Sequence, residues 1–145
     1  MIFSQERHIL RQLFIDAWAK YRAAEALEPL EKVIATVVRE HPEYHASLEN
    51  ADTALDQDYL PELGQSNPFL HMSLHIAVRE QLAADRPAGI LEIYQSLLNK
   101  YHDPHNVEHR MIDCLGETLW RAQRAGAPPD EAAYMECLSK AACSS

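Results

Sequence analysis

Apolar residues recur every three or four positions along most of the chain, which is the period of an amphipathic helix. The expected helices cover residues 4–26, 29–40, 42–49, 67–84, 88–101 and 103–125, with a short last helix after Pro129. Their ends are predicted from prolines, from Asn and Asp caps and from Gly126. Because no stretch alternates with the period of two of a strand, the predicted class is all-α. We expect one domain, residues 1–145, built as a single bundle of five to six helices.

The segment NPFLHMSLHIAVREQLAA, residues 67–84, is the most apolar of these helices. Asn67 is a typical N-cap, and Pro68 fits the first helical turn. Its apolar side chains point in almost every direction around the axis, so we expect a central helix that the first and fifth helices cover. This arrangement predicts nearly complete burial of Leu74, Ile76 and Val78.

Residues 50–66 have no sustained period and contain several acidic residues, a proline and a glycine. We expect a strap that crosses the surface and is held by its few apolar side chains. Such a strap is also a candidate docking site for a partner protein.

The net charge of −9 argues against a nucleic-acid partner, which would require a basic surface. No apolar run approaches the roughly 20 residues of a membrane span. The three cysteines, Cys114, Cys137 and Cys143, form no CxxC motif and are odd in number, so we expect reduced thiols. Charged residues near the N-terminus replace the apolar run of a signal peptide, and the predicted location is the cytoplasm.

Six of the eight histidines form three pairs with a spacing of four: His41/His45, His71/His75 and His105/His109. On a helix, residues four apart face the same side, so both rings can reach one ion. Zinc, iron and nickel accept neutral imidazole, but a stable site needs three or four ligands. Two pairs on facing helices would therefore suffice.

The pair inside the central helix is the best candidate, and a nitrogen from the pair at the start of the fifth helix would complete the site. The candidate ligands are His71, His75, His105, His109, His41, His45 and Glu108. Glu108 lies on an apolar helix face, where its carboxylate needs a cation, either a metal or Arg79. The alternative for each histidine is an ordinary core residue, hydrogen-bonded to a carbonyl or a carboxylate.

Known catalytic patterns are largely absent. The chain contains neither the Glu-x-x-His pair of di-iron bundles nor HExxH. His102 and Asp103 form the dipeptide of the HD phosphohydrolases, but Pro104 makes Asp103 a helix cap instead. Whether the protein is an enzyme is left open by its sequence.

Three long segments, HPEYH, NPFLHMSLHIAVREQ and CLGETLWRAQRAG, carry a resemblance to a known family. By the residues of these segments and by their order along the chain, nearly the whole chain resembles domain of unknown function 1841, a family of small proteobacterial proteins. The resemblance implies a free-standing bacterial cytoplasmic protein and brings no activity or ligand with it.

The leading interpretation is a helical bundle that binds a transition metal ion, zinc, iron or nickel, through its histidine pairs. A water in an open coordination position would allow hydrolytic chemistry. The alternative is a non-catalytic adaptor or structural protein that acts through an exposed helix face, on another protein or on a second copy of itself. That alternative predicts histidines hydrogen-bonded inside the protein and a large apolar surface patch.

Overall fold

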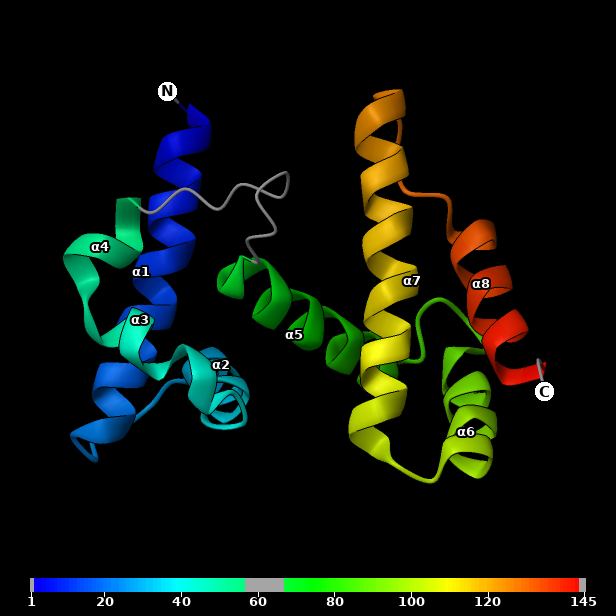
Figure 1. Ribbon diagram of the computed structural model, residues 1–145, viewed down its shortest axis with the longest axis horizontal. Coiled ribbons are helices and arrows are strands. Elements are labelled where there is room, and N and C mark those ends of the chain that lie inside the picture. The colour runs from blue at the N-terminus through cyan, green and yellow to red at the C-terminus, as the bar shows by residue number, and fades with distance from the viewer. Residues whose placement is uncertain (1, 57–66, 144–145) are drawn as a thin grey trace. The chain divides into compact units, whose positions relative to one another are not determined.

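The computed structural model describes residues 2–56 and 67–143, and every regular element in these ranges is helical (Figure 1). The predicted all-α class is confirmed. The chain forms two compact units, 1–76 and 77–145, and the boundary falls inside one helix, α5 (Pro68–Ala84). The predicted single bundle of five to six helices is not confirmed. Over the described ranges, no helix is both long and apolar enough to cross a membrane.

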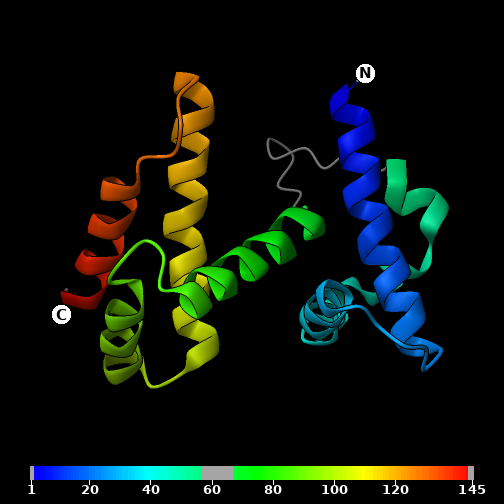
Figure 2. The same ribbon diagram turned by 180° about the vertical axis from the view of Figure 1, so that it is seen from behind.

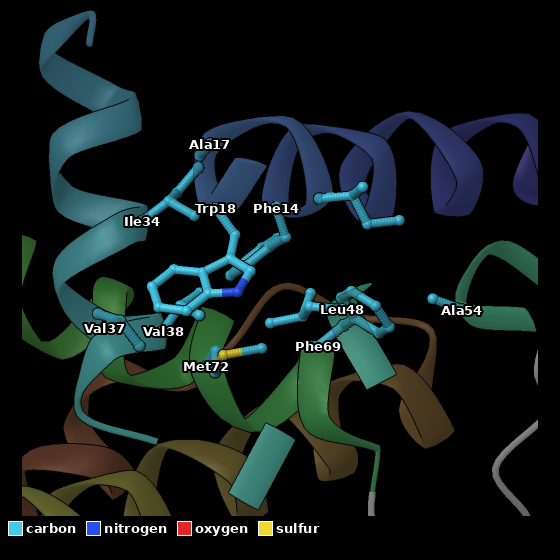
Figure 3. Close-up of a cluster of buried hydrophobic side chains, with 11 residues drawn as sticks. Phe14, Ala17, Trp18, Ile34, Val37, Val38, Leu48, Ala54, Phe69 and Met72 are labelled. Carbon is cyan, nitrogen blue, oxygen red and sulfur yellow. The ribbon is translucent and has the colours of Figure 1, made fainter. Parts of the chain in front are cut away.

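The first unit is organised around its N-terminal helix. Its elements are α1 (Ile2–Arg22), α2 (Pro29–Arg39), the 3-10 turn η1 (Pro42–Tyr44), α3 (His45–Glu49), α4 (Ala51–Asp56) and the first half of α5. α1 packs against α2, α3 and α4. Figure 3 shows the buried side chains of this core, with Phe14 and Trp18 of α1 facing Phe69 and Met72 of α5. The rings of Phe14 and Phe69 meet edge to face, with centroids 5.9 Å apart.

The second unit contains the rest of α5 and three further helices, α6 (Ile90–Tyr101), α7 (Pro104–Ala125) and α8 (Glu131–Cys143). Each of these three packs against the other two, as Figures 1 and 2 show from opposite sides. A disulfide between Cys114 and Cys137 joins α7 to α8, and Cys143 is a free, exposed cysteine. The prediction of three reduced thiols is therefore wrong. Because these cysteines are 23 residues apart, their pairing depends on the packing of two helices, which spacing rules do not capture.

The predicted capping residues are confirmed at the starts of both long central helices. The Asn67 side chain accepts hydrogen bonds from the backbone N–H groups of Phe69 and Leu70, and Asp103 accepts one from His105. α7 ends at Gly126, whose φ of 62° is the left-handed conformation that glycine adopts easily.

Two predicted segments differ from the structure. α1 ends at Arg22 instead of residue 26, because Ala24 takes a left-handed conformation and the N–H of Glu25 bonds back to the Lys20 carbonyl at 2.9 Å. The predicted strap begins with a short helix, α4 (Ala51–Asp56). Its six residues are too few to show the apolar period of a helix, so the sequence did not predict it. Residues 57–66, the rest of the strap, lie outside the described residues.

The predicted burial of α5 is only partly correct. Val78 is fully buried, as expected, but Leu74 and Ile76 are half-buried and Leu70 is 56% exposed. The helix thus has a solvent-facing side, despite an apolar composition that suggested complete cover. Composition reports the tendency to be buried, whereas neighbouring helices decide which side is covered.

Candidate metal centre

His41 follows the last turn of α2 and is only 2% exposed. Its Nδ1 lies 2.7 Å from the carbonyl oxygen of Val37. Since a carbonyl oxygen can only accept, Nδ1 carries the hydrogen, and Nε2 of the neutral ring presents a lone pair. Tyr44 stacks on the ring with an interplanar angle of 4° and a centroid distance of 5.6 Å. The ring of His41 is therefore held in both tautomer and orientation.

His71 and His75 lie one turn apart on α5, as their spacing predicts. Their Nε2 atoms are 3.0 Å apart, and His75 is fully buried whereas His71 is half-buried. The Nε2 of His75 is also 3.2 Å from the Nε2 of His41. Three imidazole nitrogens from two separate segments of the first unit thus converge on one point.

These separations suit ligands of one metal ion. Two nitrogens that bind an ion at about 2.0–2.1 Å, with an angle of about 90–109° between them, are about 2.8–3.4 Å apart. Both measured Nε2 separations, 3.0 and 3.2 Å, fall in this interval. A ring nitrogen of each of the three histidines lies within 4.8 Å of those of the other two.

Hydrogen bonding alone accounts for the cluster less well. An imidazole Nε2 carries either one N–H or one lone pair, directed along a single line in the ring plane. The Nε2 of His75 faces both other rings, so its two contacts cannot both be linear hydrogen bonds. A cation placed between the three rings would be bound by all three lone pairs at once.

His45, the partner of His41 in the HPEYH segment, has a different role. Its Nε2 donates to the carbonyl oxygen of Val38 at 2.8 Å, and its ring packs on Trp18 with centroids 4.3 Å apart. The turn η1 separates His41 from His45, so the two residues do not share one helical face. His45 instead satisfies a carbonyl at the end of α2.

The remaining candidates belong to the second unit. The rings of His105 and His109 lie one turn apart on α7, with centroids 4.2 Å apart. The Glu108 carboxylate accepts a hydrogen bond from the Nε of Arg79 at 2.9 Å. Arg79 was one of the two cations expected beside Glu108, the other being a metal ion. A ligand role for His105, His109 or Glu108 stays a prediction.

The third nitrogen was expected from the histidine pair at the start of the fifth helix. Within the first unit, the Nε2 of His41 lies 3.2 Å from that of His75, and Tyr44, which no spacing singled out, stacks on His41. His41 follows the last turn of α2, and this position allows its Nδ1 to donate to the Val37 carbonyl. Tyr44 is half-buried, and burial, with a smaller contribution from the Glu43 carboxylate, raises the pKa of its phenol. The only sequence signal for Tyr44 was its place inside HPEYH, between the two histidines.

Comparison with known proteins identifies the family. The sequence model of the family described as "Domain of unknown function (DUF1841)" matches residues 6–140. The chain belongs to the DUF1841 family. No curated protein and no solved structure matches it. All three clustered histidines of this DUF1841 chain lie within the matched residues. Because the family description includes no activity, the function has to be inferred from the geometry of the site.

Proposed function

We propose that the protein binds a transition metal ion through the Nε2 atoms of His41, His71 and His75. The observation that supports this most directly is the convergence of three ring nitrogens at separations typical of metal ligands. The hydrogen bond from His41 Nδ1 to the Val37 carbonyl is the kind of second contact that orients a metal-binding imidazole.

The donor set limits the choice of ion. Three neutral nitrogen donors suit zinc, nickel, iron(II) and cobalt, whereas magnesium and calcium prefer oxygen ligands. Three protein ligands leave at least one coordination position for water or for a further ligand. His41 and His75 are buried, whereas His71 is half-buried. The ion would therefore enter and leave the site past His71. A water bound there would be acidified by the ion, and hydrolytic chemistry is the reaction class that this allows.

The first experiment is elemental analysis of protein purified without a histidine tag, followed by thermal melting with added zinc, nickel, cobalt and iron(II). An ion at 100 times its dissociation constant stabilises the folded state by about 2.7 kcal/mol. For a chain of this size, that corresponds to a rise in melting temperature of roughly 5–10 °C. Magnesium serves as the negative control.

Matched histidine variants test which residues hold the ion. His75→Gln should abolish the metal-induced rise, because it removes the nitrogen that contacts both other rings. The control is His45→Gln, which removes a neighbouring histidine whose Nε2 is bonded to a carbonyl. This control should lower the metal-free melting temperature but leave the metal-induced rise intact.

Two results would reject the proposal. One is a wild-type protein that no transition metal stabilises. The other is a His75→Gln protein that responds to metal as strongly as wild type. In either case the three histidines are core residues that hydrogen-bond among themselves, and the adaptor function takes precedence.

A further inference from the structure

A groove in the second unit runs between the C-terminal half of α7, the loop that follows it and α8. Its volume is about 520 Å³, within the range of small-molecule sites. Alanines and Pro128 form much of its wall, and Glu117, Arg121 and Asp130 supply its charges. Both halves of the Cys114–Cys137 disulfide also line it. The groove therefore places a disulfide beside space for a small molecule.

The two sulfur-bearing residues differ in accessibility. Cys114 is 5% exposed, whereas Cys137 is half-buried and faces the groove from α8. A thiolate attacks a disulfide at one sulfur and displaces the other, so access decides which sulfur forms the new bond. A thiol that entered this groove would reach Cys137 first, and Cys114 would leave.

We propose that Cys137 is a site of S-thiolation by a low-molecular-weight thiol of the amino-acid or peptide type. The thiolate bonds to the sulfur of Cys137, the Cys114–Cys137 bond breaks, and Cys114 departs as a thiolate that takes up a proton. A second equivalent of the same thiol then attacks the mixed disulfide. It leaves Cys137 as a thiol and releases the oxidised small thiol, so two thiols supply the two electrons of the full reduction.

The charges of the groove favour a thiol that carries both a carboxylate and an ammonium group. Arg121 would bind the carboxylate, and Glu117 and Asp130 lie on the same lining for the ammonium group. Arg121 is paired with Glu117 at 2.7 Å, but both side chains are more than half exposed. Such an exposed pair contributes about 1 kcal/mol or less, so exchanging it for a ligand carboxylate costs little.

The test uses the full chain carrying Cys143→Ser, which removes the exposed third cysteine. The oxidised protein is treated with glutathione, quenched with acid at intervals and analysed by intact mass and peptide mapping. The expected first product carries one glutathione on Cys137. The uncharged thiol 2-mercaptoethanol, run in parallel, measures reactivity without charge recognition.

The contribution of Arg121 is measured against a matched arginine. Arg121→Gln should slow the reaction with glutathione roughly two- to five-fold and leave that with 2-mercaptoethanol unchanged. Arg124→Gln is the control, because Arg124 lies over the Trp120 ring and does not line the groove. It should change neither rate.

The proposal is overturned by glutathione bound to Cys114 in place of Cys137, by a Cys114–Cys137 bond that glutathione leaves intact, or by equal effects of the two arginine variants. If the adduct of the intact disulfide is too short-lived, Cys114→Ser in the same background is treated with oxidised glutathione. Its Cys137 should be thiolated several-fold faster than Cys114 in the corresponding Cys137→Ser protein. Equal rates would also reject the proposal.

Discussion

Met72 and Leu74 lie two residues apart on α5, and the structure gives them different surroundings. Met72 is 0% exposed and belongs to the core cluster of the first unit, whereas Leu74 is half-buried. Leu and Met have similar helix propensities, so replacing either with alanine changes the helix itself by a similar amount. A comparison of Met72→Ala with Leu74→Ala therefore isolates the effect of packing.

The expected costs follow from burial. Truncating a fully buried methionine to alanine removes its transfer free energy and leaves a cavity, which together cost about 2–5 kcal/mol. A half-buried leucine loses part of the transfer term and leaves no closed cavity, so we expect about 1–2 kcal/mol. From the middle of each range, Met72→Ala should lower the free energy of unfolding about twice as much as Leu74→Ala.

The measurement is urea unfolding followed by tryptophan fluorescence in the presence of a chelator. The chain has two tryptophans, and Trp18 lies in the same core cluster as Met72. A Trp120→Phe background leaves Trp18 as the only reporter, so the signal comes from the first unit. Equal losses for the two variants, or a larger loss for Leu74→Ala, would show that the description of α5 is wrong.

Three further predictions concern other parts of the chain. Asn67→Ala should destabilise the first unit by about 1 kcal/mol, because two N–H groups at the start of α5 lose their acceptor; Asn67→Asp, which retains an acceptor, should largely restore stability in the same urea assay. Replacing both Cys114 and Cys137 with alanine should destabilise the second unit by about 3 kcal/mol, since the disulfide closes a 23-residue separation; an unchanged Trp120 fluorescence transition would contradict this. Burial raises the pKa of Tyr134, whose hydroxyl donates to Gln81 at 2.7 Å. Its phenol should therefore ionise at a higher pH than an ordinary tyrosine in an ultraviolet titration. Because the unfolded phenol ionises near pH 10, the stability from Tyr134 should be complete below that pH and decline above it; Tyr134→Phe should remove this alkaline decline.

The positions of most helices could be predicted from short-range signals. Short-range signals come from Asn67, Pro68, Asp103, Pro104 and Gly126, each of which acts on backbone groups within a few residues. α5 and α7 begin, and α7 ends, where these residues indicate. Such signals do not depend on the rest of the fold. The short helix α4 was missed because six residues are too few to show a period.

The candidate metal site of His41, His71 and His75 could be predicted only in part from spacing along the chain. The spacing of four placed His71 and His75 on one face of α5, because that relation is set by helix geometry alone. It could not identify His41 as their partner, since His41 reaches His75 from 34 residues away and through a turn. The same spacing suggested a pair in His41 and His45 that the turn η1 breaks up.

By itself, the sequence determined the helical class, most helix ends and the His71/His75 pair, because each depends on residues no more than about one turn apart. Only the tertiary structure decided which side of α5 is covered, which third histidine joins the pair and which cysteines meet. Those outcomes depend on how separate helices pack, and packing brings together side chains whose distance along the chain carries no signal. The nitrogen cluster and the Cys114–Cys137 bond are both products of that packing.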